Sequence, residues 1–473
     1  MVYGSGLLAV WLMASAGLTQ TQPPAQTAAS NQPDAGYYFL LGRYLESSGK
    51  IDEAAAALKQ AIALAPGLAQ PRAELAAFYA RQDNAGDAVT AAEDALKVDP
   101  ENREANRVLG SVLAALIEDN QPARPGDDVS AYPARAIKAL EIAKGNDSTE
   151  ELSVDLALAR LYMRARRPAD AIGPLRRIFL ENPGFVQGAL LLAQAQQASG
   201  KPDEALSTLE SVLTDDPSQA RARVLQAEIL EQQRRWKDAA ESWKAAQELV
   251  PGNGDIAARR AIALLNSGDS AGAESAARAA KASNPTDVRV LYVLGVALEA
   301  RNAFDEALPI LEDAARRAPD NGAVQYQYGS VLDRVGRKAD AEQVLRAVVA
   351  KNPEDASALN YLGYMLAEKG ASLDEAVGYI QRALKSDPDN PSFLDSLGWA
   401  YFRQGKLDLA DRPLTAAAEK QPKNSVIQDH LGDLRIAQRR TAEAVAAWQR
   451  ALAGDGDSID RVRIQKKISD AQR

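Results

Sequence analysis

The stretch SLGWAYFRQGKLDLADRPLTAAAEKQP (396–422) contains a glycine, an alanine twelve residues later, and a proline twelve residues after the alanine. The same order of residue types is present in LLGRYLESSGKIDEAAAALKQAIALAP (40–66) and in VLGVALEARNAFDEALPILEDAARRAP (293–319). Self-similarity at a fixed period of about 20–50 residues is the sequence signature of repeat architectures. The chain is therefore interpreted as a repeat array before any domain boundary is drawn.

A small residue, glycine or alanine, recurs along the chain at a position that we call the small slot. Successive small slots are 34, 34 and 49 residues apart, then 34 six times, then 35 and 34. Twelve repeats therefore run from about residue 35 to about residue 456. The small slots are Gly42, Ala76, Gly110, Ala159, Ala193, Ala227, Ala261, Gly295, Gly329, Gly363, Gly398 and Gly432.

A second recurring position, the alanine slot, holds alanine in all twelve repeats. Apolar residues at helical spacing surround both slots, for example Leu397 and Tyr401 beside the small slot and Leu414 beside the alanine slot. Small side chains at both slots let two helix backbones approach closely, whereas larger ones would force the helices apart. Each repeat is predicted to be a first helix carrying the small slot and a second helix carrying the alanine slot. The alanine slots are Ala54, Ala88, Ala136, Ala171, Ala205, Ala239, Ala273, Ala307, Ala341, Ala376, Ala410 and Ala444.

The period of 34 residues, with its small residue, alanine and closing proline, resembles the tetratricopeptide repeat. The resemblance implies an all-α fold: an α-solenoid in which about twelve helix-turn-helix repeats form a right-handed superhelix with a concave groove. It also implies binding of other proteins. The C-terminal repeats are similar to those of exported bacterial members, many of which are lipoproteins, but this chain has no cysteine for a lipid anchor.

Two segments depart from the repeat pattern. The third repeat contains the stretch DNQPARPGDDVSAY (119–132), whose proline, glycine and aspartate content predicts a surface loop. A tolerated insertion is the simpler interpretation of this loop, and a functional loop is the alternative. The tail 457–473 mixes isoleucine and valine with many charges, which predicts a capping helix over the last repeat.

The N-terminus differs in composition from the repeats. SGLLAVWLMASAGL (5–18) is an uncharged apolar run, and Ala14-Ser15-Ala16 matches a signal-peptidase pattern. The sequence predicts a signal peptide over 1–16, a flexible linker over 17–34, and a periplasmic or secreted protein. The first six residues contain no lysine or arginine, so an uncleaved N-terminal anchor and a cytosolic protein stay open as alternatives.

Composition excludes several kinds of chemistry. The chain has no cysteine, a single histidine and a net charge of −9, which exclude disulfides, thiolate nucleophiles and two-histidine metal sites, and disfavour a general nucleic-acid binder. No phosphate-binding glycine loop is present. We therefore expect no enzymatic activity, no metal, no cofactor and no membrane span beyond the N-terminal segment. His430 is predicted to be an ordinary residue on a helix surface.

In the geometry that the resemblance implies, the groove is lined by residues three before, one after and four after each small slot, which we call the groove stripe. Aromatic residues gather on this stripe in repeats eight to eleven, with carboxylates at its C-terminal end. Exposed aromatic groups flanked by charge are typical of binding surfaces, although packing between adjacent repeats is an alternative explanation for them. The predicted partner-binding residues are Tyr292, Tyr326, Asn360, Tyr364, Asp395, Trp399, Phe402, Arg403, Asp429 and Asp433. A secondary basic patch is predicted at Arg107, Arg160 and Arg164.

The sequence thus favours an exported scaffold or adaptor that binds a partner protein or an extended peptide in its groove, in a process of the bacterial cell envelope. An envelope or export component that handles glycans or lipids is one alternative. A cytosolic assembly platform is the other, and it depends on the fate of the N-terminal segment.

Overall fold

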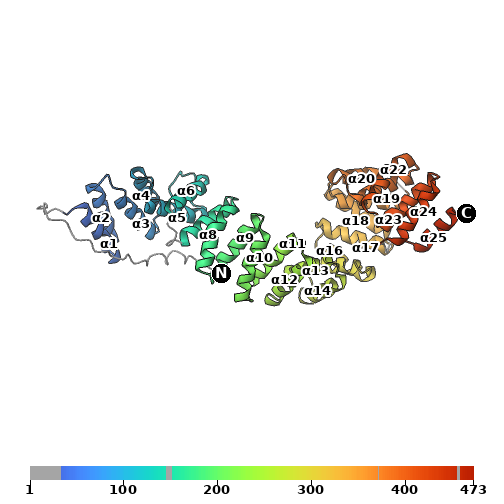
Figure 1. The fold of residues 1–473 in the computed structure, drawn as a ribbon, viewed down its shortest axis with the longest axis horizontal. Coiled ribbons are helices and arrows are strands. Elements are labelled where there is room, and N and C mark those ends of the chain that lie inside the picture. The colour runs from blue at the N-terminus through green and yellow to red at the C-terminus, as the bar shows by residue number, and fades with distance from the viewer. Residues whose placement is uncertain (1–32, 145–151, 371, 455–458) are drawn as a thin grey trace. The chain divides into compact units, whose positions relative to one another are not determined.

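Helix pairs follow the register of the slots in the computed structural model, which describes residues 33–144, 152–370, 372–454 and 459–473. Within these residues the chain forms 25 α-helices, one short 3-10 helix and no strand (Figure 1). Each small slot lies on an odd-numbered helix from α1 to α23, and each alanine slot lies on the helix that follows. The prediction of an all-α solenoid of helix pairs with a final capping helix is confirmed.

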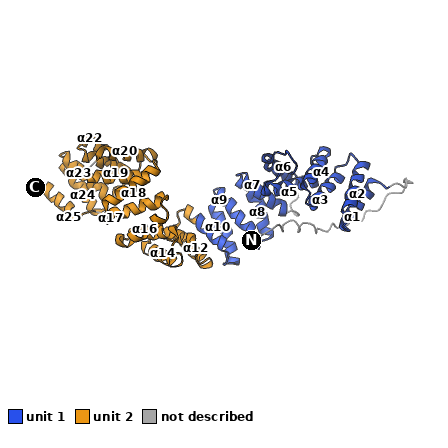
Figure 2. Cartoon of the chain, turned by 180° about the vertical axis from the view of Figure 1, so that it is seen from behind, with its two compact units in different colours: residues 1–229 blue, residues 230–473 orange. Residues whose placement is uncertain are grey.

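The chain divides into two compact units, residues 1–229 and 230–473, and the boundary falls within α11 (Figure 2). The helices up to this boundary are α1 (Ala35–Ser47), α2 (Ile51–Leu64), α3 (Gln70–Arg81), α4 (Ala85–Val98), α5 (Arg103–Asp119), η1 (Val129–Ala131), α6 (Tyr132–Lys144), α7 (Leu152–Arg164), α8 (Pro168–Glu181), α9 (Val186–Ala198), α10 (Pro202–Asp215) and α11 (Ala220–Gln232).

The second unit contains the remaining helices and all of the predicted groove residues from Tyr292 onward. Its helices are α12 (Trp236–Leu249), α13 (Gly254–Asn266), α14 (Ser270–Ser283), α15 (Val288–Glu299), α16 (Phe304–Arg317), α17 (Gly322–Arg334), α18 (Lys338–Lys351), α19 (Ala356–Lys369), α20 (Leu373–Ser386), α21 (Pro391–Arg403), α22 (Leu407–Lys420), α23 (Ser425–Ala437), α24 (Thr441–Ala453) and α25 (Arg461–Ala471).

The two slots meet at the centre of each helix pair. All twelve alanines of the alanine slot have no exposed surface. A Cβ atom added to Gly398 would lie 2.5 Å from Cγ of Leu414 and 3.0 Å from its backbone nitrogen. Such contacts are too short for a real Cβ atom, so the close crossing of α21 and α22 requires glycine at this position.

The insertion at 119–132 is fastened to the first unit. The side chain of Tyr132 is fully buried, and its hydroxyl accepts a hydrogen bond from the Ala123 N–H at 2.8 Å and donates one to Asp127 at 2.9 Å. Arg124 of the same loop donates to Glu93 of α4 at 2.8 Å. Burial raises the pKa of Glu93, but the hydrogen bonds from Arg124 and Arg135 outweigh burial and hold this pKa below its usual range. The loop is therefore an ordered part of the surface.

The predicted signal peptide 1–16 and all but the last two residues of the predicted linker 17–34 lie outside the described residues. Among the helices that are described, none is both long enough and apolar enough to cross a membrane.

The first helix of the array exposes a row of large apolar side chains. Tyr37, Leu40 and Tyr44 of α1 are 52%, 66% and 67% exposed. The residue 34 positions after Tyr44 is Phe78, which is 1% exposed. The two residues differ because a preceding helix pair covers this side of α3, whereas the described residues hold no such pair before α1.

Candidate functional site

The ten predicted groove residues lie on the first helices α15, α17, α19, α21 and α23. Their exposure divides them into two groups. Asp395, Trp399 and Asp429 are buried. The others are partly exposed: Tyr292, Tyr326, Asn360, Tyr364, Phe402, Arg403 and Asp433.

Trp399 forms part of the packing between repeats. Its side chain is 8% exposed, and its indole N–H donates to the carboxylate of Glu368 on α19. The ring of His430 on α23 stacks on it with centroids 4.0 Å apart, and the ring of Phe402 stacks on it at 5.0 Å. Trp399 therefore connects three successive first helices, as the packing explanation of the groove stripe expects. Partner binding by Trp399 stays a prediction.

His430 is not a surface residue, and the prediction that it would be one is wrong. It is 6% exposed, and its Nδ1 lies 3.0 Å from both carboxylate oxygens of Asp395. Burial lowers the pKa of His430, but the charge of Asp395 and its hydrogen bond outweigh burial, so the pKa lies above its ordinary value. The physical reason for the burial is that His430 lies two residues before its small slot, on the side of α23 that packs against α21.

The two carboxylates at the C-terminal end of the groove stripe are held by the chain itself. Asp429 lies 3.0 Å from Nη2 of Arg463 and 2.7 Å from Nζ of Lys467, both on α25. Lys467 also contacts Asp433 at 2.5 Å, and the Trp448 indole N–H donates to Asp433 at 3.1 Å. Burial raises the pKa of Asp433, which Lys467 counteracts only in part.

Acidic residues near the ends of the first helices form hydrogen bonds with the next first helix. Tyr361 donates its hydroxyl to Asp333 at 3.0 Å, and Ser330 donates to Glu299 at 2.9 Å. Burial raises the pKa of Glu299, and Ser330 lowers it only partly. The contact of Glu368 with Trp399 belongs to the same series. An acid four or five residues after the small slot is the sequence signal for these contacts, and the sequence-based prediction did not include it.

The middle of the groove stripe contains a polar atom without a hydrogen bond. Within the described part of the chain, the buried Oδ1 of Asn360 has no hydrogen-bond partner. The ring of Tyr326 on α17 packs edge-to-face on that of Tyr361 on α19, with centroids 5.8 Å apart. Burial raises the pKa of Tyr364, which is also on α19. Asn360 and Tyr364 thus share one face of α19, beside aromatic rings from the neighbouring helices.

The predicted basic patch lies on α5 and α7 of the first unit. Arg107 donates to Glu104 at 2.8 Å, and Arg160 lies 3.5 Å from Glu118. Arg164 is exposed. The charges of Arg107 and Arg160 are therefore partly compensated by glutamates of α5.

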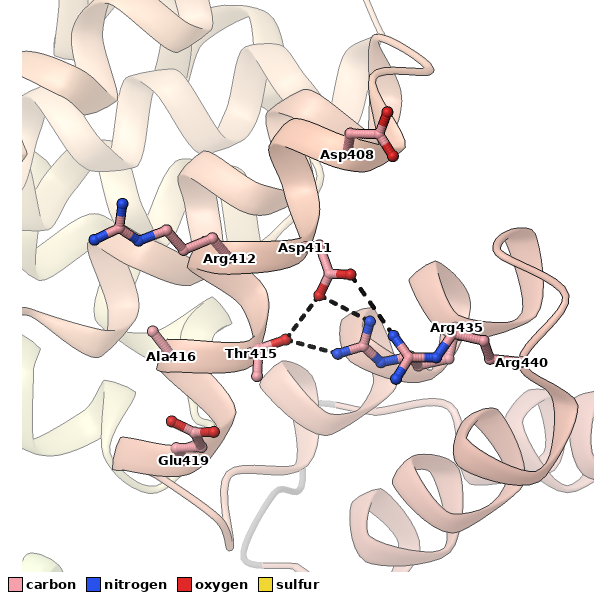
Figure 3. A pocket seen from close by; sticks show the side chains of 8 residues that line it. All are labelled: Asp408, Asp411, Arg412, Thr415, Ala416, Glu419, Arg435 and Arg440. Atoms are coloured by element: carbon pink, nitrogen blue, oxygen red, sulfur yellow. Dashed lines mark hydrogen bonds and ion pairs between the residues drawn. The ribbon is translucent and has the colours of Figure 1, made fainter.

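A separate open pocket of about 540 Å³ is lined by α22, the end of α23 and the turn between α23 and α24. Figure 3 shows Asp411 and Thr415 of α22 directed toward the guanidinium groups of Arg435 and Arg440. Arg435 donates to Asp411 at 2.8 Å and to Thr415 at 2.7 Å. These polar groups form hydrogen bonds and ion pairs with one another, and the contacts join the eleventh repeat to the twelfth. It is lined by Asp408, Asp411, Arg412, Thr415, Ala416, Glu419, Arg435 and Arg440.

Among the described residues, no group of three or more histidine, aspartate or glutamate side chains is arranged to hold a metal ion. The side chains of the groove stripe offer aromatic surface and hydrogen-bonding groups, which suit recognition of another molecule.

Comparisons with known proteins agree with the repeat register. One tetratricopeptide repeat model matches residues 75–118, 190–254, 259–322, 326–391 and 371–425, and a second matches residues 35–67. A TPR repeat-containing protein of Pseudomonas aeruginosa is 32% identical over 200 residues, which are 42% of this chain and 34% of that protein. Cellulose synthase 2 operon protein C of Komagataeibacter xylinus is 26% identical over 353 residues, which are 70% of this chain and 24% of that protein.

The chain spans about a third or less of the length of these relatives. Among solved structures, the Cut9–Hcn1 hetero-tetramer of the APC/C aligns with a TM-score of 0.47 and 12% identity, over 94% of this chain and 97% of that one. The family models together cover more than half of the residues, and the chain belongs to the tetratricopeptide repeat family.

Proposed function

We propose that the chain is a non-enzymatic scaffold for protein–protein interaction, and that it holds a segment of a partner protein along α15, α17, α19 and α21. Membership of the tetratricopeptide repeat family supports the general role, since proteins built from these repeats bind proteins or peptides. The partly exposed aromatic residues of the groove stripe support the location. Tyrosine and phenylalanine supply large contact areas at low cost in conformational entropy.

Asn360 is the observation that carries this proposal. A buried carbonyl oxygen without a hydrogen bond costs about 1–3 kcal/mol, and the Oδ1 of Asn360 has no partner in the described part of the chain. A backbone N–H of a bound segment would satisfy this oxygen once the side chains that cover it move aside. Tyr364, one helical turn further along the same face of α19, would contact the side chains of that segment.

The packing of Trp399 favours a peptide over a glycan. Sugars bind proteins through the open faces of aromatic rings, and Trp399 is the largest aromatic residue of the groove stripe. The rings of His430 and Phe402 both stack on its indole, and the indole is buried. A sugar ring would have to displace one of them.

A site-specific photo-crosslinking experiment tests the location. Benzoyl-phenylalanine introduced at Tyr292 or Phe402 should capture the same partner in native cells, and the position of Arg412 on α22 serves as an exposed control. The captured protein is then purified, and its affinity is measured for the wild type and for Asn360→Leu, which keeps the volume but removes the acceptor. We expect at least a tenfold loss. Equal capture at Arg412, or unchanged affinity of Asn360→Leu, would refute the assignment.

We also propose that the protein is exported to the cell envelope, where it presents its groove. The apolar run 5–18 and the pattern Ala14-Ser15-Ala16 support this proposal. Mass spectrometry of the protein isolated from its natural host should find a mature chain that begins at Gly17. An intact chain that begins at Met1 in the soluble fraction would overturn it.

A further inference from the structure

The last described helix, α25, buries fewer residues than any first helix that lies wholly in the second unit. It has eleven residues, and Ile464 is its one buried residue. Ile464 packs with Ala444, Trp448 and Ala451 of α24. Each of the first helices α13, α15, α17, α19, α21 and α23 buries at least five residues. The attachment of α25 therefore depends on one buried apolar anchor, Ile464, with Ile468 and Ala471 partly buried against the same cluster, and on charge.

Two basic side chains of α25 contact the carboxylates at the acidic end of the groove stripe. Lys467 contacts both Asp429 and Asp433, and Arg463 contacts Asp429. Asp429 and Asp433 are four residues apart on α23, so their like charges repel each other when no cation lies between them. The side chain of Asp429 is 5% exposed in this arrangement. The face of α23 that carries Asp429 and Asp433 is therefore stabilised by a basic group bound to it.

The register shows what α25 replaces. Lys466 lies 34 residues after the small slot Gly432, so Arg463 and Lys467 occupy the groove-stripe positions of a thirteenth first helix.

We propose that α25 is a displaceable occupant of the Asp429–Asp433 face, and that a basic amphipathic helix of a partner protein takes its place. This proposal rests on the scaffold function proposed above and names the chemistry of one partner segment. The charge and spacing of α25 define that segment: lysine or arginine at two positions four residues apart, each followed by a large aliphatic residue, as in Arg463-Ile464 and Lys467-Ile468.

Displacement is a competition between a tethered and a free helix. The tether gives α25 a high effective concentration at the face, so it blocks weak basic segments and yields only to a better match. A partner with a second contact on the aromatic part of the groove stripe gains the same kind of advantage. The acidic face would then open only for partners that also bind the groove.

The test uses a fluorescent synthetic peptide of residues 457–473 and the full chain. In the variant Ile464→Asp the apolar anchor is lost, so α25 should leave the face and the peptide should bind there in trans. We expect at least tenfold tighter binding to Ile464→Asp than to the wild type. We also expect no binding to the triple variant I464D/D429N/D433N, and at least tenfold weaker binding of a control peptide in which Arg463 and Lys467 are replaced by glutamine.

Hydrogen exchange of α25 accompanies the binding measurement. If exchange shows that α25 stays ordered in Ile464→Asp and in Arg463→Ala/Lys467→Ala, it is not displaceable and the proposal is overturned. Equal binding of the peptide to the wild type and to Ile464→Asp, or no binding to a variant whose α25 is released, would also overturn it. The crosslinks at Tyr292 and Phe402 do not depend on α25, so failure here is distinguishable from failure of the scaffold function.

Discussion

The imidazole ring of His430 lies on the indole ring of Trp399, with the centroids 4.0 Å apart and the planes inclined by 13°. The two residues come from successive first helices, α21 and α23, and they are both buried. The indole N–H of Trp399 also donates a hydrogen bond to the carboxylate of Glu368 on α19. One stacked pair thus ties together the tenth, eleventh and twelfth repeats.

Replacement of Trp399 should therefore affect stability before it affects binding. Truncation of a buried tryptophan to alanine costs about 3–5 kcal/mol, because a large cavity remains. We expect a loss of this size for Trp399→Ala in urea unfolding of the second unit followed by tryptophan fluorescence and circular dichroism. Glu368→Gln, which keeps an acceptor for the indole N–H, should cost about 1 kcal/mol or less. Equal losses for the two variants would contradict this account.

The pair of His430 and Asp395 should make stability depend on pH. The carboxylates of Asp395, Asp429 and Glu368 all act on His430, and the folded-state pKa lies above the ordinary value. The contribution of protonated His430 to the free energy of unfolding is fully present below the unfolded-state pKa of about 6.5. It disappears as the pH rises through the folded-state pKa.

The free energy of unfolding of the wild type should then exceed that of His430→Gln. The difference should be largest at about pH 6 and should shrink toward about pH 9. Urea midpoints of the two proteins across this range measure it. A difference that stays constant or grows with pH would show that the charge of His430 does not stabilise the fold.

Gly398 should not tolerate a side chain at the distance that α21 and α22 keep, whereas alanine faces leucine in two other repeats, Ala159 with Leu175 and Ala193 with Leu209. Adding a methyl group to this contact should cost about 1–3 kcal/mol, because neither helix backbone can move away freely. The chain itself supplies the control: two other repeats pair alanine with alanine at these positions, Ala76 with Ala92 and Ala261 with Ala277. Gly398→Ala should therefore cost less in the background of Leu414→Ala. Additive losses in this double-mutant cycle would refute direct contact.

The hydroxyl of Tyr132 should keep the inserted loop ordered. Tyr132→Phe leaves the Ala123 N–H without its acceptor, which should cost about 0.5–1.5 kcal/mol. Hydrogen exchange over residues 121–129 should become faster, while α4 and α6 exchange as before. Ser130→Ala in the same loop removes an exposed hydroxyl and should leave the exchange unchanged. If both variants exchange alike, Tyr132 is not the anchor.

The first helix should tolerate changes that later helices do not. Tyr44→Ala should alter the free energy of unfolding by about 0.5 kcal/mol or less, because Tyr44 is largely exposed. Phe78→Ala, at the equivalent place in the second repeat, should cost about 3–5 kcal/mol. Thermal unfolding of the two variants compares them directly. A large loss for Tyr44→Ala would mean that another segment covers α1.

The sequence by itself determined the repeat register, because the residues that define it act within one helix pair. Gly398 and Ala410 lie on adjacent helices joined by a short turn, so their spacing encodes their contact. The same holds for the other slots, and it is why the helix pairs and the all-α solenoid could be predicted. The capping role of the tail followed from its mixed apolar and charged pattern in the same way.

The tertiary structure alone decided which faces of the first helices are buried between repeats. The side chains that meet there are about one repeat apart in sequence: Trp399 meets His430, and Asp429 meets Lys467. Which of two polar or aromatic sides of a helix faces its neighbour depends on the rotation from one repeat to the next, and a pattern within one helix does not encode that rotation. For this reason His430 was misplaced, and the carboxylates predicted to meet a ligand are held by the chain's own last helix.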